Sequence, residues 1–161
     1  MEHLTRFCPN CWEELPPEAQ GICPACGRPL DEADGFLEKL LRALWHRERT
    51  RAALAATLLG RLGQPEAVPA LVEAALHHPD FGVRAAAVHS LGLLRDPRAL
   101  PAFMILLREE SPLPVRLAVV EAVAGWTDER ARAVLRAALH DPSAVVRERA
   151  RALYHGAPAE A

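Results

Sequence analysis

Between residues 34 and 156, apolar residues recur at the three- and four-residue spacing of amphipathic helices, and turn residues separate these segments at regular intervals. One stretch occurs three times, 32 residues apart: LGRLGQPEAVPAL from Leu59, LGLLRDPRALPAF from Leu91 and VAGWTDERARAVL from Val123. A period of this size predicts stacked helical hairpins, because a single hairpin cannot bury its apolar face alone. We therefore expect an all-α solenoid of about three and a half hairpins.

The pattern also predicts two kinds of helix in each unit. The first helix of each hairpin, the A helix, is expected near residues 49–62, 82–94, 114–126 and 143–155, and the second, the B helix, near 66–78, 98–110 and 129–140. The apolar segment from Phe36 to Trp45 aligns with the B helices and predicts a half-repeat that begins the stack. The expected core includes the column Leu71, Phe103 and Leu135, together with Trp45 and Trp126.

Four cysteines precede the helical region. They are Cys8, Cys11, Cys23 and Cys26, arranged as two CxxC pairs separated by eleven residues. Two such turns place four thiolates around one ion and leave no open coordination position, so the spacing predicts a structural metal site. Zinc is the expected ion, and the alternatives are an iron ion in the same site or a pair of disulfides. The stretch resembles the short zinc ribbons of bacterial proteins, and this resemblance implies one structural Zn²⁺ per chain.

The chain is expected to form two domains, a zinc ribbon over residues 1–31 and a solenoid over residues 34–156. No Gly/Ser-rich or Pro-rich linker separates them, so we expect the ribbon to lie against the end of the solenoid. Trp12 follows Cys11 directly, and a large aromatic residue in so small a domain is expected to cover the metal site or to pack on the solenoid.

Three motifs carry a resemblance to a known family. They are DPSAVVR at Asp141–Arg147, VRAAAVHSLG at Val83–Gly92 and DPRALPAF at Asp96–Phe103. The units resemble HEAT-like repeats of the phycobilisome-lyase type over residues 34–155. The resemblance implies the solenoid fold and a concave surface formed by the B helices. It does not imply one activity, because such repeats serve scaffolds, lyases, hydroxylases and DNA-repair enzymes.

Charge and composition narrow the class of protein. The 161 residues carry a net charge of −2, which gives no global field toward nucleic acid or an anionic membrane. No apolar segment is long enough to span a bilayer, and no secretory signal is visible at the N-terminus, so a cytoplasmic location is expected. In that reducing compartment, paired CxxC motifs favour metal binding over disulfides.

Two sets of residues are candidates for interactions. Arg84, Arg116 and Arg147 recur once per unit near the turn aspartates Asp80, Asp96, Asp128 and Asp141, which predicts a ladder of ion pairs between repeats. Positions that vary on the B helices are the expected partner-binding residues: Val72, Glu73, Met104, Ile105 and Arg136. The apolar run Phe103–Leu107 is consistent with a peptide-binding groove, or with deeper burial of a central helix.

The sequence favours a non-enzymatic adaptor or scaffold that binds a protein segment, with the ribbon as a cap or a second contact. The alternative is a nucleic-acid-binding protein that uses the ribbon and the arginine-rich region 130–151. Di-iron hydroxylases of related fold rely on adjacent His-Glu pairs, and no histidine of the solenoid is followed directly by Glu. No catalytic constellation is evident.

Overall fold

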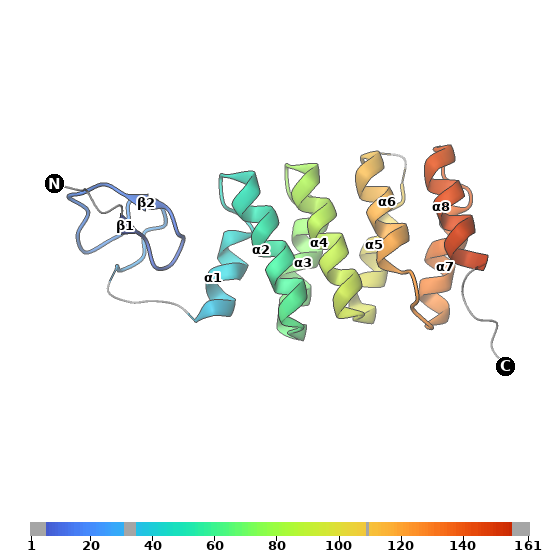
Figure 1. Ribbon diagram of the computed structural model, residues 1–161, viewed down its shortest axis with the longest axis horizontal. Helices are drawn as coiled ribbons and strands as arrows, with labels where there is room; N and C mark the ends of the chain where they lie inside the picture. Colours follow the sequence, from blue (N-terminus) through green and yellow to red (C-terminus); the bar gives the residue numbers. More distant parts are fainter. Residues whose placement is uncertain (1–5, 31–34, 109, 156–161) are drawn as a thin grey trace.

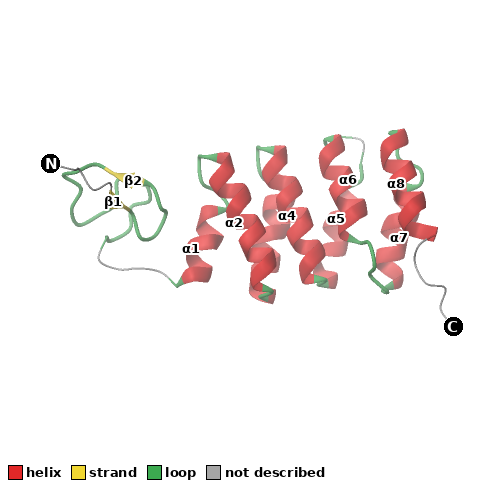
Figure 2. Cartoon of the chain, in the orientation of Figure 1, coloured by secondary structure: helices red, strands yellow, loops and turns green. Residues whose placement is uncertain are grey.

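The computed structural model describes residues 6–30, 35–108 and 110–155 of the chain, and it shows a small ribbon beside a row of helices (Figure 1). The ribbon contains two short antiparallel strands, β1 (Arg6–Phe7) and β2 (Glu14–Leu15). The helices are α1 (Phe36–Ala43), α2 (Arg49–Leu62), α3 (Val68–His77), α4 (Phe81–Leu94), α5 (Leu100–Leu106), α6 (Leu113–Ala122), α7 (Glu129–Ala138) and α8 (Ala144–His155). Within the described residues, strands occur only in the ribbon (Figure 2).

The helices form two layers, as expected for a solenoid. The A helices α2, α4, α6 and α8 pack on one another in sequence order, while α1, α3, α5 and α7 form the B layer behind them (Figure 1). The ribbon lies at the N-terminal end of this row and α8 closes the other end. The all-α solenoid predicted from the 32-residue period is therefore confirmed. No helix in the described part of the chain is long and apolar enough to cross a membrane.

Proline and aspartate explain where the helices begin. Pro65 and Pro97 each start a short 3₁₀ turn that leads into α3 and α5, where a missing N–H costs no helical hydrogen bond. The Asp80 carboxylate accepts hydrogen bonds from the N–H groups of Gly82 and Val83 and so caps α4. The same capping recurs at three other turns, through the carboxylates of Asp96, Asp128 and Asp141.

Helix α6 is shorter than the pattern predicted. It ends at Ala122 instead of near residue 126, because the chain turns at Gly125, where φ is 72°. The turn brings Trp126 back onto the core, where its indole N–H donates to the Gly92 carbonyl at 3.3 Å and its ring lies 6.2 Å from that of Phe103. The expected burial of Trp126 is confirmed.

The core runs between the two layers along equivalent positions of the repeats. Leu71 and Phe103 are fully buried and Leu135 is 4% exposed, while Leu40 of α1 extends the same column into the half-repeat. Trp45 does not join them. It lies beyond the end of α1, is 46% exposed and contacts His78 with the rings tilted and their centroids 5.4 Å apart, so its predicted place in the core is wrong.

The predicted ladder of ion pairs is also wrong in two of its three members. Arg116 pairs with Asp141 of the next unit at 2.9 Å, and both side chains are buried. Arg84 instead donates to the Ala75 carbonyl, and Arg147 donates to the carbonyls of Asp141 and Pro142. Asp96 and Asp128 pair instead with Arg98 and Arg130, two residues further along the chain. Arg84 and Arg147 donate to carbonyls near the end of the preceding B helix or in its turn.

The A helices approach one another through small residues. A Cβ atom added at Gly60 would lie 2.6 Å from Cβ of Ser90, and one added at Gly92 would lie 2.8 Å from Cα of Ala122. Ser90 also donates a hydrogen bond to the Ala56 carbonyl at 2.8 Å across the same junction. Glycine on one helix and a small residue on the next therefore set the spacing of the A layer.

We expect Gly92→Ala to destabilise the fold by about 1–3 kcal/mol, because the new methyl group would overlap the backbone of Ala122 and outweigh the gain in helix propensity. Urea denaturation followed by circular dichroism measures the change. Gly82→Ala in the same helix is the control, since a Cβ there meets only the Asp80 carboxylate. Equal stability of the two variants would contradict this account of the A layer.

Candidate metal centre and exposed B-helix surface

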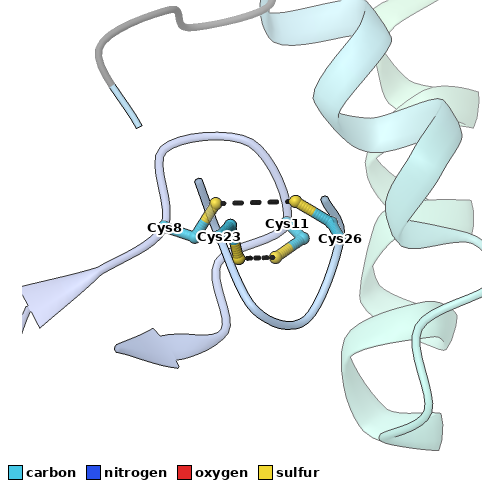
Figure 3. A group of neighbouring side chains, drawn as sticks. All are labelled: Cys8, Cys11, Cys23 and Cys26. Carbon is cyan, nitrogen blue, oxygen red and sulfur yellow. Dashed lines mark hydrogen bonds between the residues drawn. The ribbon is translucent and has the colours of Figure 1, made fainter. Parts of the chain in front are cut away.

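The four cysteines come together at one point of the ribbon (Figure 3). Their sulfur atoms all lie within 4.8 Å of one another, with 3.8 Å between Cys8 and Cys26 and 3.8 Å between Cys11 and Cys23. All four are free thiols. A tetrahedron with Zn–S bonds of about 2.3 Å has edges of about 3.8 Å, whereas a disulfide bond is only about 2.05 Å long. The donor set and its spacing therefore fit a tetrahedral metal ion.

The two CxxC turns share one backbone pattern. The N–H of Trp12 donates to the carbonyl of Cys8, and the N–H of Gly27 donates to the carbonyl of Cys23. The residue after the second cysteine has a positive φ in both turns, 59° at Trp12 and 70° at Gly27. Glycine adopts this conformation freely, whereas tryptophan does not, so the first turn relies on contacts made by Trp12.

Backbone N–H groups donate hydrogen bonds to the cysteine sulfurs and act against the effect of burial on the thiol pKa values. Burial raises the pKa of the Cys11 thiol well above its usual value. Burial also acts to raise the pKa of Cys23, but the N–H groups of Cys26 and Ala25 donate to its sulfur and bring that pKa down to about 7. A buried thiol that is hard to ionise by itself is stabilised as a thiolate by a bound metal ion.

Glu13 links the ribbon to the solenoid. Its carboxylate lies 3.0 Å from Nε2 of His46 and also contacts the guanidinium of Arg47, both just beyond α1. The hydrogen bond from Arg47 is the main reason that the pKa of Glu13 is lowered. On the next helix, Arg51 donates to the carbonyl of Trp12. These contacts tie the first CxxC turn to the beginning of the stack.

Trp12 completes this contact with its side chain. It is half-buried and packs against the core of the solenoid. Packing on the solenoid was one of the two positions expected for it. A cavity of about 560 Å³ lies between the second CxxC turn and the end of α1. The expected position of the ribbon against the solenoid is thus observed in these contacts. Sequence periodicity carried no signal for Glu13, His46 or Arg51, because contacts between unlike domains have no repeat.

The predicted partner-binding residues differ in how far they are exposed. Met104 and Ile105 of α5 are 45% and 44% exposed, and Glu73 and Arg136 are exposed on α3 and α7. Val72 is half-buried and packs against the core. Phe103 and Leu106 are buried, so α5 is amphipathic in its setting although its sequence is apolar all round.

Met104 borders a small hollow between α5 and α7. The hollow has a volume of about 280 Å³ and is lined by Leu100, Pro101, Met104, Arg130 and Ala133. Arg136 lies outside this lining and pairs with Glu129 at 2.7 Å. We call the exposed residues Glu73, Met104, Ile105 and Arg136, together with this hollow, the B-helix surface.

We predict that the protein purified without chelator contains about one zinc ion per chain, and that Cys23→Ser or Cys26→Ser reduces the zinc content to nearly zero because three thiolates no longer close the site. Elemental analysis measures the metal and also distinguishes zinc from iron. Ile22→Ser, at an exposed position of the same ribbon, should keep its zinc. A folded ribbon without metal, shown by dispersed NMR signals, would contradict the prediction.

A family model described as HEAT repeats matches residues 36–124, which include α1 to α6. No curated protein matches the chain. The matched region covers more than half of the sequence and includes the first six helices of the two-layered stack. The chain therefore belongs to the HEAT-repeat family.

Proposed function

We propose that the protein is a non-enzymatic adaptor in which the B-helix surface binds a segment of another protein, while the zinc ribbon caps the N-terminal end of the stack. HEAT repeats are generally protein-interaction scaffolds, and this supports the class of function. The observation that carries the proposal is the exposure of Met104 and Ile105 beside the hollow between α5 and α7.

The chemistry of this surface suits a protein segment. Two large apolar side chains, Met104 and Ile105, lie next to each other on α5, and the hollow beside Met104 could receive one apolar side chain of a partner. Methionine adapts its shape at low cost, which favours contact with irregular surfaces. Glu73 and Arg136 on the flanking helices would supply polar contacts at the rim.

Nucleic-acid binding is the weaker candidate. Three of the six arginines of region 130–151 pair with an acid: Arg130 with Asp128, Arg136 with Glu129 and Arg149 with Glu121. A phosphate-binding surface needs cations that are available to release counterions from the backbone, and these pairs reduce that availability. We place the protein in the cytoplasm, where a reducing environment would keep the four thiols able to hold Zn²⁺.

Affinity capture from native lysate, treated or not treated with nuclease, tests the proposal. We expect the intact chain to retain a defined protein after nuclease treatment, and Met104→Asp to lose it because a charge is placed on the apolar surface. Leu93→Asp is the control, since Leu93 is 64% exposed on the A helix α4. Recovery that requires nucleic acid and persists in Met104→Asp would contradict the adaptor proposal.

A further inference from the structure

Two histidines occupy equivalent positions in the loops before the A helices α2 and α4. His46 precedes α2, and His78 follows it by one period of 32 residues and precedes α4. In each loop, Nδ1 of the ring accepts a hydrogen bond at 3.0 Å from the backbone N–H two residues further along, which is that of Glu48 or of Asp80. The two loops therefore share one local structure. The later units have no histidine at this position.

This hydrogen bond determines which ring nitrogen is a donor. Because Nδ1 presents a lone pair to the backbone N–H, the neutral ring carries its proton on Nε2. In His46, Nε2 lies 3.0 Å from a carboxylate oxygen of Glu13, a residue of the ribbon. In His78, Nε2 has no hydrogen-bond partner among the residues that the structure describes. One donor of an equivalent pair is thus satisfied within the chain and the other is not.

The side chain of His78 is nearly buried, which makes an unsatisfied donor unusual. The residue is only 6% exposed, and its ring contacts that of Trp45. Buried polar groups in native proteins are almost always hydrogen-bonded, so this N–H requires an acceptor from solvent or from a ligand.

His78 borders a hollow between the two loops. The hollow has a volume of about 620 Å³ and is lined by residues 45–49, in front of α2, and by residues 78–80, in front of α4. We call it the His78 hollow. The half-exposed indole of Trp45 forms an apolar wall beside the histidine. The hollow has the size of a small-ligand site and combines an apolar wall with a hydrogen-bond donor.

The charged side chains that line the hollow are paired within the protein. The pairs are Arg47 with Glu13, Arg49 with Asp80 and Glu48 with Arg51. These arginines therefore do not select the ligand. The N-terminus of α2 also faces the hollow, and its N-cap residue makes no side-chain cap, whereas the carboxylate before α4 caps that helix. Uncapped N–H groups at the start of a helix favour a negatively charged group.

We propose that the His78 hollow binds the carboxylate of an aspartate or glutamate side chain of a partner protein, beside an apolar side chain that packs on Trp45. Nε2–H of His78 donates to this carboxylate as Nε2–H of His46 donates to Glu13. A carboxylate is favoured over a neutral acceptor, because its hydrogen bond to the imidazole is charge-assisted and because the uncapped start of α2 faces the same hollow. The site shares no residue with the B-helix surface and does not depend on the function proposed for that surface.

The test uses two capped tetrapeptides, one with the order alanine, glutamate, phenylalanine, alanine, and a matched one in which glutamine replaces glutamate. NMR spectra of the imidazole nitrogens follow Nε2 of His78 in the full-length, zinc-loaded protein as each peptide is added. We expect the glutamate peptide to shift this signal saturably, and the glutamine peptide to bind at least about threefold more weakly.

His78→Asn removes the donor with little change to the loop. The asparagine side-chain oxygen can still accept the N–H of Asp80, but the side chain is too short to place a donor at the position of Nε2. We expect this variant to bind the glutamate peptide about tenfold more weakly, measured by the backbone amide shifts of residues 45–49 and 78–80.

Matched controls separate this site from others. His89→Asn changes an exposed histidine of α4, and Met104→Asp alters the B-helix surface; both should leave peptide binding unchanged. Trp45→Ala keeps the donor but removes the apolar wall, so it should weaken the binding of both peptides to the same extent. Circular dichroism compares the thermal unfolding midpoint of each variant with that of the parent protein. If His78→Asn does not fold, the two peptides and Trp45→Ala decide the question.

Several results would overturn the proposal. They are equal binding of the two peptides, unchanged binding in a folded His78→Asn variant, and the absence of a shift at His78 with millimolar glutamate peptide. An equal response to inorganic phosphate would assign the hollow to small anions in general. A shift of the same signal with protein concentration, accompanied by dimerisation in analytical ultracentrifugation, would assign it to a second copy of the chain.

Discussion

Close packing between successive A helices is the constraint on which the rest of this structure depends. Gly60 against Ser90 and Gly92 against Ala122 bring the helix backbones together, and the column of buried leucines and Phe103 can fill the space between the layers only at that spacing. Each hairpin is stable because its neighbours cover it. At each end of such a stack one neighbouring hairpin is missing, so the terminal helices would expose apolar surface unless it is covered or replaced by polar residues.

The two ends are finished by different means. At the C-terminal end, α8 exposes Glu148 and Arg151 at positions that are apolar inside the stack. At the N-terminal end, the ribbon contacts the first helices through Glu13, Trp12 and Arg51, and Glu13 and Trp12 follow directly after the cysteine pair Cys8 and Cys11 of the four-sulfur cluster. A segment of about 25 residues has too little core to fold alone, so metal binding would supply the energy that keeps this end closed.

Much of the fold could be predicted from the sequence because the repeat period and the spacing of the cysteines can be read directly from the order of the residues. The period of 32 residues placed the helices, and α2 begins and ends at the predicted residues. The CxxC pairs identified the four sulfurs that the structure brings together. The shortened α6 was harder to predict, since Gly125 ends the turn in a unit that departs from the pattern.

Contacts between residues that do not recur from repeat to repeat could not be predicted from the 32-residue period. The arginines were expected to pair with aspartates because the two recur together, but Asp96 and Asp128 pair with the nearby Arg98 and Arg130, and Arg84 donates to a backbone carbonyl. Trp45 has helical spacing with the core residues, yet the chain leaves the helix just before it.

The central claim is that the metal-bound ribbon and the first helices form one structural unit. Hydrogen exchange of the full-length protein, with zinc and after chelation, tests it most directly. The account predicts that chelation increases exchange in residues 6–30 and also in α1 and the first turns of α2, while α4 to α8 keep their protection. Unchanged protection of α1 and α2 after the ribbon has lost its metal would contradict it.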